Sequence, residues 1–158
     1  MPPPRAWIAI AGSGDAAPWE LEAAEEAGAA VAEAGCGLVC GGLGGVMEAA
    51  CRGARSRGGL TVGFLPGLDR DDANGWVIAA LPTGLGEGRN VLVVRAADAV
   101  VAIGGGYGTL SEVALTLKLG RPVVSLWSWE VEGVIEASTP AEAAARALEL
   151  AARRVRSA

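Results

Sequence analysis

Six short, continuous apolar runs restrict the fold of this chain more than any other feature of the sequence. They are WIAIA at 7–11, GLVC at 37–40, LTVGFL at 60–65, WVIAAL at 76–81, AVVAI at 99–103 and PVVSLW at 122–127. Continuous runs of this length are typical of strands that are covered on both faces, as in a parallel sheet. Helix-like segments separate most of them, at about 18–34, 45–57, 86–97 and 109–119, and a last one follows at about 140–155. The alternation predicts a doubly wound, three-layer α/β sandwich with a mostly parallel sheet.

Several helix ends carry their own signals. Pro18 suits a first helical turn, and Gly35 suits a left-handed residue that ends a helix. Thr139 followed by Pro140 and Glu142 has the pattern of an N-cap with a reciprocal Glu. No linker, repeat or low-complexity block divides the chain, so residues 1–158 are expected to form a single domain.

The composition excludes several classes of function. The net charge is −5 and no long Lys/Arg cluster occurs, which argues against a nucleic-acid partner. The absence of histidine removes Ser-His and Cys-His nucleophiles, so proton chemistry would need carboxylates, arginine, Tyr107 or Lys118. No apolar segment reaches the ~18 residues of a membrane span. We expect a soluble, cytoplasmic protein without a membrane partner.

Neither the cysteines nor the acidic loop predicts a metal site. Cys36, Cys40 and Cys51 lack metal-type spacing and are expected to be buried thiols in a reducing cytoplasm. Cys40 abuts a glycine cluster, but core packing is favoured over a role as a metal ligand. The polar loop at 69–75 has Ala73 where a calcium loop needs a ligand and no Glu after it, which favours a solvated turn.

Three glycine clusters follow apolar runs and lead toward helices. They are Gly12 with Gly14, Gly41 through Gly45, and Gly104 through Gly108. Because the carboxyl ends of parallel strands meet at one edge of a sheet, the clusters are expected to converge there. Glycine lets a ligand approach the backbone, and helix N-termini attract anions. The pattern predicts a site for a small phosphate-bearing ligand, although each cluster alone could simply tighten a turn.

A nicotinamide cofactor is not expected. GSGDAA at 12–17 fits a loose dinucleotide pattern, but the second strand ends at Cys40 without the acidic residue that would bind the ribose. The phosphate loop of ATPases is absent as well.

Arg89 and Glu112 each have a structural explanation. Thr109 to Glu112 reads as a capping box in which Thr109 caps a helix and Glu112 returns a hydrogen bond. Arg89 could be an ordinary surface residue at a helix start. Taken together, however, the two residues lie in a segment that resembles the motif of a known protein family.

The segment TGLGEGRNVLVVRAADAVVAIGGGYGTLSEVALTLKLGRPVV, at 83–124, resembles the LONELY GUY superfamily of Rossmann-like proteins. Many of its members are labelled "possible lysine decarboxylase". CGGLGGVMEAACRGA, at 40–54, resembles their glycine-rich phosphate or nucleotide loop. Asn90, which follows Arg89, and Gly104, at the start of the signature, depart from the enzymes. The enzymes commonly have Lys and Pro, respectively, at these two positions. Both departures are typical of the branch that includes the molybdenum cofactor carrier proteins.

The resemblance implies a ligand and a set of site residues. The expected ligand is a molybdenum cofactor or, alternatively, a nucleoside 5′-monophosphate from which a phosphoribohydrolase would release the base. In the enzymes an Arg and the signature Glu are associated with catalysis, which gives Arg89 and Glu112 here. The expected binding residues are Gly12, Ser13, Gly14, Gly41, Gly42, Gly44, Gly45, Met47, Thr83, Arg89, Asn90, Gly104, Gly105, Gly106, Tyr107, Gly108, Thr109 and Glu112.

The last expectation concerns assembly. The segment EVALTLKLG, at 112–120, is apolar on most of its circumference and needs a second surface to pack on. A homodimer or a dimer of dimers is therefore expected, a state the superfamily also favours. Trp76, Trp127 and Trp129 are expected to fill the core or a subunit contact.

Overall fold

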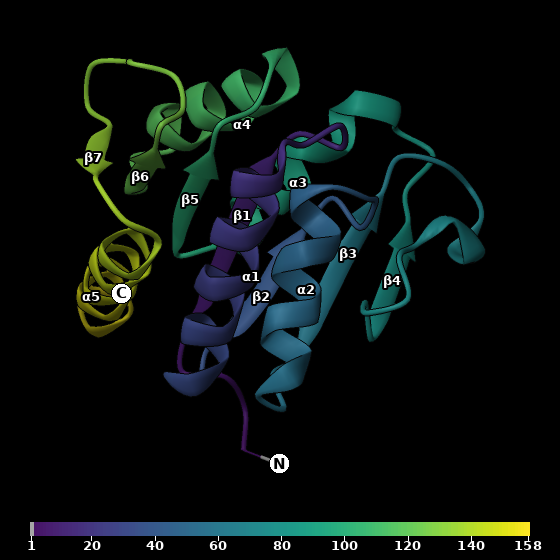
Figure 1. Cartoon of the computed structure of the whole chain (residues 1–158), viewed down its shortest axis with the longest axis horizontal. Helices are drawn as coiled ribbons and strands as arrows, with labels where there is room; N and C mark the ends of the chain where they lie inside the picture. Colours follow the sequence, from purple (N-terminus) through teal and green to yellow (C-terminus); the bar gives the residue numbers. More distant parts are fainter. Residues whose placement is uncertain (1) are drawn as a thin grey trace.

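The computed structural model describes residues 2–158, which form a parallel seven-stranded sheet (Figure 1). The strand order is β4-β3-β2-β1-β5-β6-β7. The strands are β1 (Trp7–Gly12), β2 (Gly37–Cys40), β3 (Thr61–Leu65), β4 (Ala79–Pro82), β5 (Ala99–Ile103), β6 (Val123–Leu126) and β7 (Ile135–Ala137). The helices are α1 (Pro18–Glu33), α2 (Val46–Ser56), α3 (Asn90–Ala96), α4 (Tyr107–Lys118) and α5 (Pro140–Ser157), with 3₁₀ turns at Arg70–Asp72 and Gly86–Arg89.

Helices cover both faces of the sheet, so the predicted three-layer architecture is confirmed. On one face α1, α2 and α5 bury a core with Ile8, Ile10 and Leu38. On the other face α3 packs Val93 and Val94 against β1, β2 and β5, and α4 covers β5 and β6. Burial on both faces explains why these strands read as continuous apolar runs.

The direction of chain progression across the sheet reverses at β1. This strand pairs with β2 on one side and with β5 on the other, and the final pair joins Gly12 to Ile103. In Figure 1 the carboxyl ends of these central strands lie at the top of the molecule. The loops that leave β1 and β5 therefore separate around a crevice at this edge, which is where open α/β sheets bind ligands.

The contact between α1 and α2 depends on two glycines. A Cβ on Gly28 would lie 2.1 Å from the carbonyl oxygen of Ala50, and a Cβ on Gly53 would lie 2.0 Å from that of Glu25. Neither distance is possible for a real side chain, so the two helix backbones touch directly. We call this the glycine helix contact. It holds α1 and α2 rigidly beneath the carboxyl edge.

Most helix and strand ends agree with the sequence, but four details differ. Residues 86–97 form a 3₁₀ turn followed by the short helix α3, β4 begins at Ala79, and β7 was not predicted. The helix α4 begins at Tyr107 with Gly106 as its N-cap, so the predicted capping role of Thr109 is wrong. The Thr109 side chain is buried under the preceding turn, where Gly105 leaves it room.

The cap at Thr139 and the left-handed Gly35 are confirmed: the Thr139 hydroxyl accepts the N–H of Glu142, and Gly35 has φ 74°. Trp76 and Trp127 do not lie in the core, because they are 42% and 59% exposed in the single chain. The alternative, a subunit contact, stays a prediction. Among residues 2–158, no helix combines the length and apolar character of a membrane span.

Candidate functional site

The first and second glycine clusters meet at the carboxyl edge of the sheet. The N–H of Val46, at the start of α2, donates to the carbonyl oxygen of Ser13 over 3.0 Å. A Cβ on Gly12 would lie 2.6 Å from the Val46 side chain, and one on Gly45 would lie 2.2 Å from the Ser13 carbonyl oxygen. These two glycines are therefore required by the close approach of the two loops.

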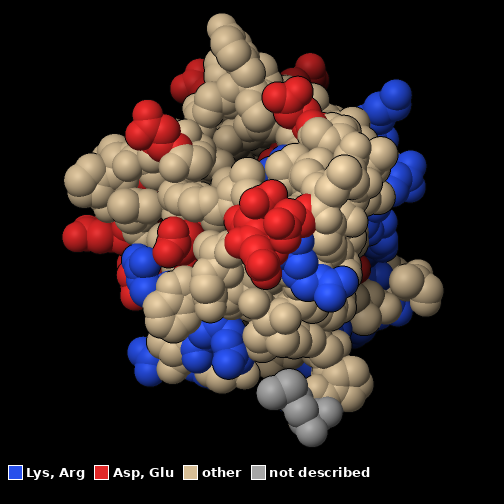
Figure 2. All heavy atoms as spheres, turned by 90° about the vertical axis from the view of Figure 1, so that its right-hand side faces the viewer, with Lys and Arg blue, Asp and Glu red and all other residues tan. Residues whose placement is uncertain are grey.

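A pocket of about 230 Å³ lies where these loops face the N-terminus of α4. Its lining residues are Gly12, Ser13, Gly14, Met47, Glu87, Arg89, Asn90, Gly106, Gly108, Thr109 and Glu112. The space-filling view shows a hollow near the top of the molecule, bounded by uncharged atoms and several acidic side chains (Figure 2). The pocket thus takes residues from the loop after β1, from the start of α2, from the 86–90 turn and from α4.

Arg89 is a buried cation with part of its hydrogen-bonding capacity unused. Its side chain is 8% exposed; Nε donates to the carbonyl oxygen of Phe64 over 2.9 Å, and Nη1 donates to Oδ1 of Asn90. Nη2 donates to no residue in the described part of the chain and lies against Gly41, where a Cβ would be only 2.7 Å away. Gly41 therefore makes room for the guanidinium, and a buried charge of this kind favours an anionic partner.

Asn90 links Arg89 to the first turn of α4. Its Nδ2 donates to Ser111 Oγ over 3.0 Å, and the Ser111 hydroxyl donates to the carbonyl oxygen of Gly108 over 2.6 Å. The chain of hydrogen bonds fixes the guanidinium relative to the N-terminus of α4. A ligand anion would therefore meet donors that are already in place.

Glu112 is a pocket carboxylate whose pKa is shifted by its surroundings. Burial raises the pKa of Glu112 to about 7, although the charge of Arg89 acts in the opposite direction. A carboxyl with this pKa exchanges its proton near neutral pH, which is the property required of a general acid or base. When protonated it can donate a hydrogen bond, and when ionised it repels an anion.

The third glycine turn is held by side chains from elsewhere in the chain. Glu20, at the start of α1, accepts the N–H of Gly105 at 3.2 Å and the N–H of Ala17 at 2.6 Å. From the loop after β6, the Ser128 hydroxyl donates to the carbonyl oxygen of Gly104, and the Trp129 indole N–H donates to that of Gly106. These contacts fix the turn before any ligand arrives.

Three glycines of the pocket have space for a side chain that the sequence does not place there. A Cβ built on Gly14, Gly106 or Gly108 meets no atom within 4 Å, and none of the three has a positive φ. Gly108 even lies within α4, where alanine would favour the helix by up to about 1 kcal/mol. Beside them, the amides of Tyr107, Gly108 and Thr109 precede the first hydrogen bond of α4, from Leu110 N–H to the Gly106 carbonyl oxygen. Open space and backbone N–H donors therefore lie close together at the start of α4.

A model of the SLOG cluster4 family matches residues 5–153, nearly the entire chain. The chain belongs to the SLOG cluster4 family. An uncharacterized protein of Archaeoglobus fulgidus is 43% identical over 137 residues, which cover 86% of this chain and 90% of that protein.

Two solved structures are similar to this SLOG cluster4 protein over most of their length. The molybdenum cofactor binding protein of Rippkaea orientalis is 37% identical, with a TM-score of 0.83 over 90% of this chain and 93% of that one. The molybdenum cofactor (Moco) carrier protein of Chlamydomonas reinhardtii is 35% identical, with a TM-score of 0.85 over 96% of this chain and 99% of that one. The resemblance drawn from the sequence motifs is confirmed at the level of family and fold.

Not every predicted site residue of the SLOG cluster4 protein lines the pocket. Those that do are Gly12, Ser13, Gly14, Met47, Arg89, Asn90, Gly106, Gly108, Thr109 and Glu112. The residues that lie outside its lining are Gly41, Gly42, Gly44, Gly45, Thr83, Gly104, Gly105 and Tyr107. Gly41 and Gly45 lie behind the pocket, against Arg89 and Ser13, and Thr83 donates its hydroxyl to the carbonyl oxygen of Leu65.

One lining residue, Glu87, was missed by the sequence analysis. It lies in the 3₁₀ turn that precedes Arg89, and the prediction of one long helix for this segment concealed its position. No motif in the sequence marks it. Its carboxylate adds to the acidic side of the pocket.

Cys40 and Cys51 have the expected burial, whereas Cys36 is only half-buried. Cys40, at the end of β2, and Cys51, on α2, are buried with their sulfur atoms 3.6 Å apart. The hydrogen bond with Cys40 and burial both raise the pKa of Cys51, so its thiol stays protonated at neutral pH. Cys40 does not line the pocket and also accepts the N–H of Gly42.

Proposed function

We propose that the protein is a molybdenum cofactor carrier that holds the phosphate end of the cofactor in the 230 Å³ pocket. The observation that carries the proposal is the coincidence of open space at Gly14, Gly106 and Gly108 with an unused donor on buried Arg89. The similarity to two solved molybdenum cofactor proteins gives the ligand class.

The size and polarity of the pocket fit one end of such a ligand. Pockets for complete small molecules are commonly about 300–1,000 Å³. The pocket is smaller, so it fits a phosphate and the atoms next to it. The free amides at the start of α4 and Nη2 of Arg89 are suitable donors for phosphate oxygens.

Once bound, the cofactor supplies the molybdenum chemistry, and the chain supplies binding and orientation. Arg89 neutralises negative charge, and the Asn90–Ser111 hydrogen bonds keep the guanidinium facing α4. Because the pKa of Glu112 is about 7, its ionisation above neutral pH places the negative charge of its carboxylate beside the negatively charged phosphate. Affinity for the cofactor is therefore expected to fall as the pH rises from 6 to 8.

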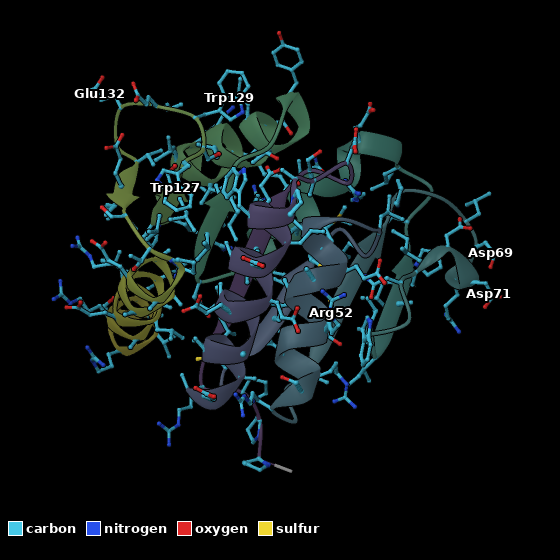
Figure 3. All side chains as sticks on the ribbon, in the orientation of Figure 1. Arg52, Asp69, Asp71, Trp127, Trp129 and Glu132 are labelled. Atoms are coloured by element: carbon cyan, nitrogen blue, oxygen red, sulfur yellow. The ribbon has the colours of Figure 1, made fainter. Side chains whose placement is uncertain are left out.

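The test is a titration of the protein with isolated molybdenum cofactor and, separately, with inorganic phosphate. Arg89→Met should weaken both by about tenfold or more, since a hydrogen bond to a charged group contributes about 1.5–3 kcal/mol. Arg52→Met is the matched control, because Arg52 lies on α2 and pairs with Glu25 at the surface (Figure 3). A wild-type protein that binds neither probe, or an Arg89→Met variant that binds as well as wild type, would contradict the proposal.

The pKa of Glu112 also supports a second candidate, hydrolysis of a nucleoside 5′-monophosphate. A carboxylate near a ribose can stabilise an oxocarbenium-like transition state or activate water, and Glu112 faces the same pocket as Arg89. Incubation with AMP would then release adenine, and Glu112→Gln would abolish the release. Absence of adenine at high protein concentration would exclude this activity and leave the carrier.

We infer a homodimer or a dimer of dimers from the helix α4. Its Leu110, Leu115 and Leu117 remain half-buried in the single chain, which leaves apolar surface for a second subunit. Light scattering measures the mass directly, and a mass of 15.8 kDa would overturn the inference.

A further inference from the structure

A second pocket, of about 460 Å³, lies on the other side of the Gly104–Gly106 turn. Its lining includes Trp19, Glu20, Gly105, Trp127, Ser128 and Trp129. We call it the aromatic pocket. Figure 3 shows Trp127 and Trp129 in the upper part of the molecule, beside α4 and the upper end of α1. Three of the five tryptophans of the chain therefore border one opening at the carboxyl edge.

The tryptophan rings are held in fixed positions by their mutual contacts. Trp19 and Trp127 meet edge to face with ring centroids 5.2 Å apart, and both remain substantially exposed, at 40% and 59%. Trp129 stacks on Tyr107 with centroids 5.8 Å apart, while its indole N–H is held by the carbonyl oxygen of Gly106. Large aromatic faces left in water at a fixed position are typical of a binding surface.

The backbone at Trp127 is in a disfavoured conformation. Trp127 has φ 49° and is the one non-glycine residue with positive φ within residues 2–158. A bulky side chain is rarely found in this region, and such strain concentrates at ligand sites. Ser128, the next residue, keeps the loop in place through its bond to Gly104. The fold thus holds the indole of Trp127 at the opening instead of letting it turn inward.

The polar atoms of the aromatic pocket are mostly hydrogen-bond acceptors. Glu20, Glu130 and Ser128 line the same pocket as the three tryptophans. Each carboxylate oxygen has two lone pairs, and each oxygen of Glu20 accepts one backbone N–H. Flat aromatic walls with acceptors at the rim match a planar heterocycle that carries N–H donors, such as an amino-substituted fused ring.

We propose that the aromatic pocket binds the planar heterocyclic ring of the same ligand whose phosphate end occupies the neighbouring pocket. The inference rests on the proposed function for the phosphate half. Gly104 and Gly105 line the aromatic pocket and Gly106 lines the neighbouring one, and three residues span at most about 10 Å. Gly106 has open space where a Cβ would be, so its own position adds no side chain between the two pockets.

The test separates the two halves by calorimetric titration with molybdenum cofactor, with unsubstituted pterin and with inorganic phosphate. Trp127→Gly removes the ring and accepts the positive φ, and Trp19→Ala removes its partner at an exposed helix start. Each should weaken the cofactor and pterin by about tenfold or more, the usual effect of removing a stacking residue, and leave phosphate affinity unchanged. Trp76→Ala is the control, since Trp76 is equally exposed but borders neither pocket.

The results distinguish the two proposals. Folded Trp127→Gly and Trp19→Ala variants with wild-type affinity for cofactor and pterin would overturn the aromatic pocket and leave the phosphate site intact. Variants that change the subunit number while ligand affinity stays unchanged would instead identify the tryptophans as a subunit contact and overturn the inference. Binding of pterin but not of cofactor or phosphate, lost in both variants, would support the ring site and contradict the proposed function.

Discussion

The glycine helix contact and the rim of the 230 Å³ pocket both contain glycines, but for opposite reasons. At the contact, Gly28 and Gly53 press against backbone oxygens of the facing helix at distances that exclude any Cβ. At the rim, Gly108 is also helical but has nothing near it. A missing side chain stabilises the fold in the first region and leaves space at the expense of helix stability in the second. The comparison separates the glycines that packing requires from those that it does not.

The largest effect is expected at the helix contact. Gly53→Ala places a methyl group 2.0 Å from the carbonyl oxygen of Glu25, so α1 and α2 must separate. The free energy of unfolding should fall by about 3 kcal/mol, the upper part of the range for overpacked sites. Urea denaturation followed by circular dichroism measures the loss. Full tolerance of the alanine would show that this contact is not tight and would weaken the comparison.

A smaller effect, of opposite sign, is expected at Glu112. Its folded pKa of about 7 lies above the ordinary value of 4.5, so the native state binds more protons than the unfolded chain between these pH values. The free energy of unfolding that the Glu112 carboxyl contributes at low pH is therefore lost as the pH rises through this window. Glu112→Gln should therefore change little at pH 4 and add roughly 2 kcal/mol at pH 8.

Denaturation of Glu112→Gln and wild type at both pH values checks this sign. A gain of the same size at pH 4 and pH 8 would mean that the ionisation of Glu112 is not the cause. A loss at pH 8 would show that the carboxylate stabilises the fold, and the pocket rim would then resemble the helix contact.

The smallest effect on stability is expected at Gly108. Gly108→Ala adds a methyl group in open space within α4 and should raise the free energy of unfolding by up to about 1 kcal/mol. The same methyl group occupies pocket space, so affinity for phosphate should fall. Gly14→Ala is a matched variant outside any helix, expected to change stability by less than about 0.5 kcal/mol while also weakening binding. Destabilisation by Gly108→Ala would break the comparison.

The sequence analysis placed the glycine clusters at one edge because the carboxyl ends of parallel strands all lie at the same edge of a sheet. It could not separate the glycines that face the pocket from Gly41 and Gly45, which make room for Arg89 and Ser13. That difference depends on what each missing Cβ would touch, and such contacts come from residues far apart in the chain.

Local context misled the prediction in two further places. Thr109 has the sequence of a cap, yet tertiary packing against Gly105 draws its side chain inward and α4 begins two residues earlier. Trp127 ends an apolar run and was expected in the core or a subunit contact, but a left-handed backbone keeps its ring out of the core. In both cases a turn with unusual backbone angles overrides the side-chain pattern.

The strand order has a mechanical consequence. The chain builds β1 through β4 on one side and β5 through β7 on the other, and the two halves join along the β1–β5 pair. The 230 Å³ pocket lies over this seam: Ser13 and Arg89 precede β5 in the chain, and Gly108 follows it. A ligand held by residues from both halves would link them. Separation of the halves would then require release of the ligand, so ligand release and local opening of the sheet would be coupled.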